Sequence, residues 1–150
     1  MPDEKEFVEE LTLKQQEVRV HEASLSVEER VRLQDTLAAT IRRLVELGDI
    51  VRHKGLLILG EAETLAPDAG DDDLCWMLMM VLDGFDPSLL YEYCWKRYKE
   101  SGYTGAAALR YLLLMTGCAM IQYVARPADI EEALLAMVPA PVKARYEKKE

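Results

Sequence analysis

Apolar residues recur at helical spacing along almost the whole chain. The clearest example lies within residues 27–65, where apolar or small residues are separated alternately by four and three positions. They are Leu37, Ile41, Leu44, Gly48, Val51, Gly55 and Ile58. This spacing predicts one long helix with a continuous seam along one face. No segment between turns alternates apolar and polar residues with a period of two, so no strand is predicted.

Two glycines, Gly48 and Gly55, lie on this seam. Glycine inside a helix costs about 1 kcal/mol relative to alanine, so its presence at two seam positions needs a reason. One hypothesis is that both glycines let another backbone approach closely, and that the chain forms a homo-oligomer through the Gly48/Gly55 seam. The alternative is that one of them kinks or ends the helix.

Local signals indicate where other helices begin and end. Ser26 followed three residues later by Glu29 is a capping box, in which each side chain accepts a hydrogen bond from the other residue's backbone N–H. Gly84 suits the end of one helix because glycine tolerates a positive φ. Asp86 suits the N-cap of the next helix, and Pro87 suits its first position, where no N–H is needed.

Together these signals predict an all-α protein, folded as a compact bundle of about five or six helices with one long helix in its N-terminal half. After the long helix, further helices are predicted at residues 74–82, 87–100, 104–124 and, beginning at Pro127, 127–138. The predicted domain organisation is a polar N-terminal helix or arm at 1–25, a helical domain at 26–141 and a charged C-terminal tail at 142–150.

The charge of the chain narrows its possible partners. The 150 residues carry a formal net charge of −9, which argues against a nucleic-acid partner because phosphate binding needs a surplus of Lys and Arg. Between Glu61 and Asp86 there are eight acidic residues and no Lys or Arg. This stretch is either a solvated face or an acidic docking surface for a basic partner.

Cysteine usage and the apolar runs favour a cytoplasmic protein without a membrane span. Cys75, Cys94 and Cys118 are odd in number and widely spaced, so we expect small buried thiols in a reducing compartment. The N-terminus lacks the apolar core of a signal peptide. The apolar stretch at residues 111–123, which carries no formal charge, is shorter than the roughly 18–20 residues of a span, which predicts a buried core helix.

Candidate chemistry is sparse, and we expect no enzyme, no cofactor and no metal site. His53 follows Asp49 by one helical turn, which could orient an imidazole, but no nucleophile lies nearby and a surface ion pair is the simpler interpretation. The aspartates at 71–73 lack the alternating oxygen ligands of a calcium loop. The sequence holds no phosphate-binding glycine loop and no nucleophile elbow.

Aromatic and methionine residues cluster in the second half of the chain. The aromatic set is Trp76, Tyr91, Tyr93, Trp95 and Tyr98, and four methionines lie at 77, 79, 80 and 115. At helical spacing such residues are typical of a core. The alternative is that they line a ligand pocket, which would make the protein a small helical ligand-binding or sensory domain.

Three segments in order resemble the cytoplasmic parts of MotA-type flagellar stator proteins. They are residues 52–59 (RHKGLLIL) followed by Glu61, residues 80–90 (MVLDGFDPSLL), and residues 117–122 (GCAMIQ) followed by Pro127, 130–132 (IEE), Leu134 and Pro139. In that family the corresponding patterns are R-x-x-G-L-L-x-L-E, an apolar helix ending in D-G-x-D-P, and G-x-x-x-I-Q followed by P-x-x-I-E-E and a proline. The resemblance spans roughly residues 42–141.

The chain also departs from this family. Members have four membrane spans, the last two lying between the second and third segments, whereas only about residues 100–114 separate those segments here. The resemblance therefore implies a bacterial stator-like domain without an ion channel. In the family an arginine and a glutamate eight residues later face the rotor. Arg52 matches the arginine, but the glutamate position falls on Gly60, one residue before Glu61.

The resemblance thus implies a non-enzymatic protein-protein interaction module whose partner is a flagellar rotor or motor component. The expected contact residues are Arg52, Lys54, Glu61 and Glu63. On one continuous helix Lys54 and Glu61 would share a face, and Arg52 and Glu63 would share another. Mixed-charge surfaces of this kind set orientation and association rate more than affinity.

Overall fold

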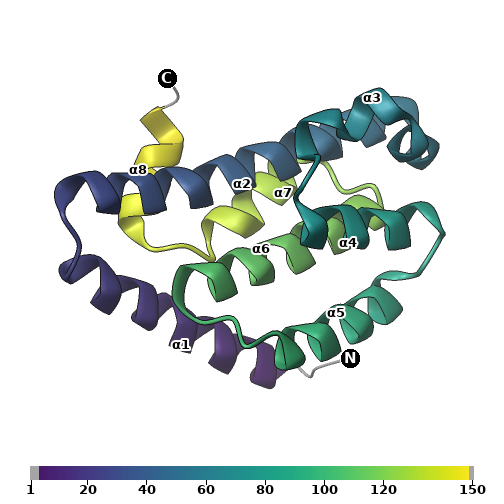
Figure 1. The fold of residues 1–150 in the computed structure, drawn as a ribbon. Coiled ribbons are helices and arrows are strands. Elements are labelled where there is room, and N and C mark those ends of the chain that lie inside the picture. The colour runs from purple at the N-terminus through teal and green to yellow at the C-terminus, as the bar shows by residue number, and fades with distance from the viewer. Residues whose placement is uncertain (1–3, 149–150) are drawn as a thin grey trace.

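The computed structural model describes residues 4–148, and within them the helices are joined by short turns and there is no strand (Figure 1). The elements are α1 (Glu4–Ala23), α2 (Val27–Lys54), η1 (Leu56–Gly60), α3 (Ala62–Leu65), η2 (Ala66–Asp68), α4 (Asp72–Leu82), α5 (Pro87–Ser101), α6 (Gly105–Gln122), α7 (Pro127–Leu135) and α8 (Ala140–Lys148). The predicted all-α class is confirmed. The described residues form eight α-helices and two 3-10 turns, so the expected five or six helices is an undercount.

Helix α6 lies at the centre of the bundle and is surrounded by other helices (Figure 1). Helices α1, α2, α4 and α5 all pack against it, and α7 and α8 pack against α2. Among the described residues α6 is the one helix long and apolar enough, by length and composition, to cross a membrane, although we expected no span. In the structure 61% of its residues are buried, and the core helix of a globular protein meets the same composition test.

The long helix predicted over 27–65 is wrong beyond Lys54, because Gly55 ends α2. Gly55 has a φ of +86°, which side-chain-bearing residues rarely adopt, and its N–H donates to the carbonyl of Val51 at 2.7 Å. The chain then continues through η1, α3 and η2. Lys54 and Glu61 therefore do not share a helix face, and neither do Arg52 and Glu63.

The two glycines of the Gly48/Gly55 seam lie in different surroundings. Gly48 is buried, and a Cβ placed there would lie 2.4 Å from Cδ1 of Ile130 in α7. The close approach that Gly48 permits is thus made by the chain's own α7. Gly55 lies outside the helix, and a Cβ placed there would meet nothing within 4 Å. Gly48 thus packs into the core while Gly55 stays exposed, and the homo-oligomer through this seam stays a prediction.

The predicted helix boundaries at residues 26 and 86 are present in the structure. Ser26 Oγ accepts from the N–H of Glu29 at 3.2 Å, and the Glu29 carboxylate accepts from the N–H of Ser26 at 3.0 Å. Asp86 accepts from the N–H of Leu89 at 3.0 Å, and Pro87 is the first residue of α5. These contacts satisfy N–H groups that the first helical turn leaves without partners.

The other two expected boundaries also hold. Gly84 has a φ of +87° and follows α4, and Pro127 is the first residue of α7. Both positions use the backbone preference of their residue type, a positive φ for glycine and a fixed φ without an N–H for proline.

The charged tail predicted at 142–150 is a helix up to Lys148, and residues 149–150 lie outside the described residues. Helix α8 packs on α2 through Val142, which is fully buried, and Tyr146, whose ring centre lies 5.2 Å from the Arg42 guanidinium. Arg145 pairs with Asp35 of α2 through two hydrogen bonds of 2.8 and 3.1 Å, which lower the pKa of Asp35. The apolar stripe of α8 is short, so its order depends on this packing.

Helix α1, within the expected N-terminal arm at 1–25, is part of the bundle. Val18 is fully buried, and Gln15 donates to the carbonyl of Met137 at 2.7 Å. Glu17 accepts from the N–H of Gly105 at 2.9 Å, so α1 supplies a partner for the first turn of α6. The same hydrogen bond is the main cause of the lowered pKa of Glu17.

Candidate functional site

The four expected contact residues lie on an exposed stretch at one end of the bundle, residues 52–63, which we call the charged segment. Arg52 is in the last turn of α2, and its guanidinium donates to the carbonyl of Val124 at 3.1 Å. Lys54, Glu61 and Glu63 are all exposed. The structure thus places the four residues in one segment, but not on one helix face.

A leucine that sequence reasoning did not single out is the most exposed large apolar residue among those described. Leu57 in η1 is 81% exposed, whereas Leu59 two residues later is only 2% exposed. Leu59 packs η1 against the core, whereas Leu57 faces solvent. In the sequence, basic residues precede Leu57 and acidic residues follow it. A single exposed apolar residue is common by itself, so Leu57 is a candidate contact only together with the charged residues that flank it in the sequence.

An ion pair anchors the chain that follows the charged segment. The Arg43 guanidinium makes hydrogen bonds of 2.9 and 2.7 Å to the two carboxylate oxygens of Asp68, and a third of 2.7 Å to the carbonyl of Thr64. The Asp68 side chain is only 5% exposed, and its hydrogen bonds raise the pKa of Arg43. We call these contacts the Arg43 clamp. Its partners are 21 and 25 residues away, so no local pattern could indicate it.

The histidine–aspartate pair lies on the surface. His53 Nδ1 lies 3.3 Å from Asp49 Oδ1, and the two side chains are 72% and 57% exposed. The same nitrogen lies 2.9 Å from the Asp49 carbonyl. A pair this open to water offers no desolvated site for base catalysis, and it is an ordinary surface contact.

The aspartates at 71–73 are used by the fold. Asp71 accepts a long, 3.4 Å hydrogen bond from the N–H of Leu74 and forms an ion pair with Arg110. Asp73 accepts from the Tyr103 hydroxyl at 2.7 Å and lies 3.4 Å from an Arg97 nitrogen. Within residues 4–148 no three His, Cys, Asp or Glu side chains gather in a metal-binding arrangement.

Most of the aromatic set belongs to the core. Trp95 and Tyr98 are 8% and 6% exposed, and they stack with ring centroids 5.4 Å apart. Tyr98 stacks in turn on Tyr111 of α6 at 5.5 Å, and burial raises the pKa of both tyrosines. Tyr93 is the exception, because it is 48% exposed. The expectation that these aromatic residues belong to the core therefore holds for Trp95 and Tyr98.

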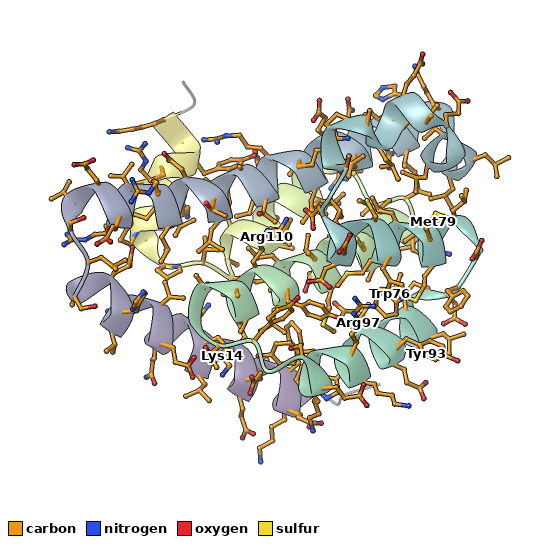
Figure 2. All side chains as sticks on the ribbon, in the orientation of Figure 1. Lys14, Trp76, Met79, Tyr93, Arg97 and Arg110 are labelled. Carbon is orange, nitrogen blue, oxygen red and sulfur yellow. The ribbon has the colours of Figure 1, made fainter. Side chains whose placement is uncertain are left out.

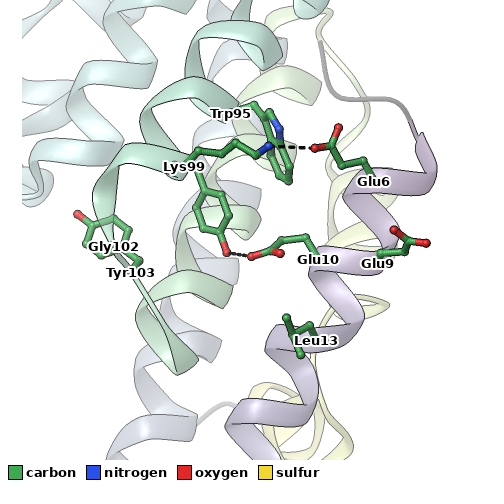
Figure 3. Close-up of a pocket in the computed structure, with 9 residues that line it drawn as sticks. Glu6, Glu9, Glu10, Leu13, Trp95, Lys99, Gly102 and Tyr103 are labelled. Atoms are coloured by element: carbon green, nitrogen blue, oxygen red, sulfur yellow. Dashed lines mark hydrogen bonds and ion pairs between the residues drawn. The ribbon is translucent and has the colours of Figure 1, made fainter.

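A groove of about 530 Å³ lies where α1 crosses the end of α5 (Figure 3). Its walls combine Glu6, Glu9 and Glu10 of α1 with Trp95, Tyr98 and Tyr103. The Tyr98 hydroxyl donates to Glu10 at 2.5 Å. The Lys99 ammonium lies 3.1 Å from Glu6 and 5.7 Å from the Trp95 ring centre. The groove therefore already holds a cation of the chain itself.

The cysteines are free thiols shielded from water. Cys94 and Cys118 are buried, and Cys75 is half-buried. Burial raises the pKa of Cys94 to about 12 and that of Cys118 well above its ordinary value. A nucleophilic thiol needs a lowered pKa and access to substrate, and these two thiols have neither.

The geometry defines a helical bundle with an exposed mixed-charge segment and an acidic, aromatic groove. Comparison of the chain with protein-family models, with curated proteins and with solved structures finds no match. Any statement about its function therefore depends on the residues and their arrangement.

Proposed function

We propose that the protein is a non-enzymatic interaction module that resembles the cytoplasmic part of a MotA-type flagellar stator subunit without its channel. It would act in the bacterial cytoplasm, where its three thiols stay reduced, by docking on a rotor or another motor component. The observation that carries the proposal is the charged segment, in which Leu57 stands 81% exposed between Arg52 and Lys54 on one side and Glu61 and Glu63 on the other.

The placement of the three stator-like segments supports the proposal. The ends of α2, α4 and α6 and the beginnings of α5 and α7 lie on the same side of the bundle (Figure 1). The first and second segments touch, since a Cβ at Gly60 would lie 3.3 Å from Leu82. The first segment also reaches the turn after the third, through the hydrogen bond from Arg52 to Val124. Residues separated in sequence thus form one surface region.

The contact chemistry fits a reversible partner. Exposed charges on a surface steer encounter and set orientation, while each exposed ion pair adds little affinity. Leu57 supplies an apolar group that a partner can bury, and removal of apolar surface from water favours association. Gly60 occupies the position of the family's glutamate in this chain. In this proposal Glu61 and Glu63 take the place of that glutamate.

A binding assay with charge-reversed protein tests the proposal. Purified candidate rotor and motor proteins would be titrated against the wild type, the double variant Arg52→Glu with Glu61→Arg, and Leu57→Ser. We expect each variant to bind its partner about tenfold more weakly, because a lost contact of about 1.4 kcal/mol gives that factor. Unchanged circular dichroism and melting temperature would show that the fold is intact.

The control for this assay is Val20→Ser, which replaces an apolar residue that is 74% exposed on α1. It should leave binding unchanged. If every candidate motor protein binds the wild type and both charged-segment variants equally well, the assignment of this surface is wrong. If none binds the wild type, the link to a motor is wrong.

The groove between α1 and α5 favours a second function, a small helical ligand-binding or sensory domain. Carboxylates and aromatic rings together suit a cationic organic ligand, which would displace Lys99 from Glu6 and Trp95. A thermal-shift screen of organic amines tests this function. A ligand that raises the melting temperature of the wild type, and not of Glu9→Gln with Glu10→Gln, would support it.

A further inference from the structure

The helical hairpin formed by α4 and α5 presents an apolar surface that the bundle does not cover. Met79 and Tyr93 are each 48% exposed and Leu89 is 37% exposed, while Trp76 and Phe85 are half-buried beside them. We call these five residues the hairpin patch. Single exposed apolar residues are common, but a cluster of large ones on one surface marks an interaction site.

Contacts across the hairpin show that the patch is continuous. The Arg97 guanidinium of α5 lies 4.4 Å from the centre of the Trp76 ring of α4. Met79 follows Trp76 by three residues on α4, and Tyr93 precedes Arg97 by four residues on α5, so each is a one-turn neighbour of this pair on its own helix (Figure 2). The Phe85 ring centre lies 5.7 Å from that of Tyr93. The patch therefore runs from the bend to the Trp76–Arg97 pair.

The surroundings of the patch are acidic. Residues 72–97 hold five acidic residues, Asp72, Asp73, Asp83, Asp86 and Glu92, and two basic residues, Lys96 and Arg97, at the end away from the bend. Arg97 borders the patch, but its charge is offset by Asp73, 3.4 Å away. Near the bend, Asp83 and Asp86 are exposed, and no basic residue of the hairpin lies between them. The patch thus combines large apolar side chains with a rim that is negative near the bend and mixed in charge at its other end.

We propose that the hairpin patch binds a cationic amphipathic helix of a partner protein. Tryptophan, methionine and tyrosine adapt to apolar side chains spaced three and four apart on a helix, and Asp83 and Asp86 would attract basic residues on its flanks. A second copy of this chain fits poorly, since a two-fold contact would bring one acidic rim against another. Anionic membranes and nucleic acids carry the wrong charge for the same reason.

A designed peptide provides the probe. It would be a helix of about 18 residues in which leucines repeat at i, i+3, i+4 and i+7 and lysines fill the other face. The variant Trp95→Phe leaves Trp76 as the reporter, because the chain has two tryptophans. Binding should shift the emission of Trp76 to shorter wavelength as the peptide covers it. The same peptide with glutamate in place of lysine should not bind.

Substitutions in the patch locate the site. In the reporter protein, Met79→Ser with Tyr93→Ser should weaken binding of the lysine peptide at least about tenfold, and Asp83→Lys should weaken it about threefold at low salt and less at high salt. The control is Val20→Ser with Val27→Ser, which removes two apolar residues that are 74% and 71% exposed elsewhere. That double variant should bind as the reporter protein does.

Several results would overturn the inference. They are equal binding of the lysine and glutamate peptides, equal loss of binding in the valine control, or concentration-dependent dimerisation that Met79→Ser abolishes. The test is independent of the charged segment, because Arg52→Glu with Glu61→Arg should leave peptide binding unchanged. Failure at the hairpin patch and failure of the proposed motor docking are therefore distinguishable.

Discussion

A methyl group added at Gly117 tests how tightly α6 is packed against α2. A Cβ at this position would lie 2.8, 3.0 and 3.1 Å from the Cδ1, Cδ2 and Cγ atoms of Leu44, which is fully buried. Contact with the branch point as well as both methyl groups means that the whole side chain must move. Overpacking of this kind costs about 1–3 kcal/mol, while Gly→Ala in a helix gains about 1 kcal/mol.

We therefore expect Gly117→Ala to lower the free energy of unfolding by about 1 kcal/mol, the difference between these two effects. In a Leu44→Ala background the sign should reverse. Leu44→Ala alone should cost about 2–5 kcal/mol, and it removes all three atoms that the new methyl group would meet. Adding Gly117→Ala there should restore about 1 kcal/mol, because only the gain in helix propensity remains.

Urea unfolding of the four proteins, followed by far-ultraviolet circular dichroism, measures this cycle. The expected coupling between the two sites is about 2 kcal/mol, well above the value for independent positions. The slope of the unfolding free energy against urea concentration should be the same for all four proteins, which would show that they unfold between equivalent native and unfolded states. If Gly117→Ala changes stability equally in both backgrounds, Leu44 does not limit the space at Gly117 and the packing argument is refuted.

Three further predictions concern charge and burial. Arg43→Met should lower unfolding free energy by about 3 kcal/mol in denaturant titration, because it leaves the Asp68 carboxylate buried without its partner. Cys94, whose pKa burial raises to about 12, should react with a thiol reagent at neutral pH only after unfolding. Folding lowers the pKa of Glu17 below its ordinary value of 4.5, so this carboxylate stabilises the fold above pH 4.5, and that stability is lost as pH falls through the lower folded pKa. In Glu17→Gln the melting temperature should therefore depend less on pH across this acidic range than in the wild type.

Features set by neighbouring residues were predictable from the sequence. The capping box at Ser26 and the bend at Gly84 and Asp86 depend on hydrogen bonds and φ preferences within a few residues. Helix α4 was expected at 74–82 and occupies Asp72–Leu82, because its apolar run lies between turn residues. The all-α class follows from the same local patterns.

Features set by distant contacts were not predictable. The seam spacing continues past Gly55, so the pattern alone could not decide whether the helix continues or ends there. Helix α8 has only Val142 and Tyr146 buried, and its order comes from α2, where Arg42 bonds to the carbonyl of a residue 103 positions later. The candidate site shows the same division. Its four charged residues are proposed from the sequence pattern, whereas Leu57 comes only from the structure, because its exposure depends on how η1 packs.

The break at Gly55 has a consequence for the proposed docking surface. A stretch of short turns between two helices is ordinarily the part of a protein that opens most easily. Here it is fastened at three points: Gly55 bonds to Val51, Leu59 is buried, and the Arg43 clamp holds its far end. The fastened stretch can present Leu57 and its flanking charges in one orientation, which lowers the entropy lost on binding. In the proposed function, the end of α2 at Gly55 therefore places Leu57 and its flanking charges on a preorganised stretch of turns rather than on a continuous helix.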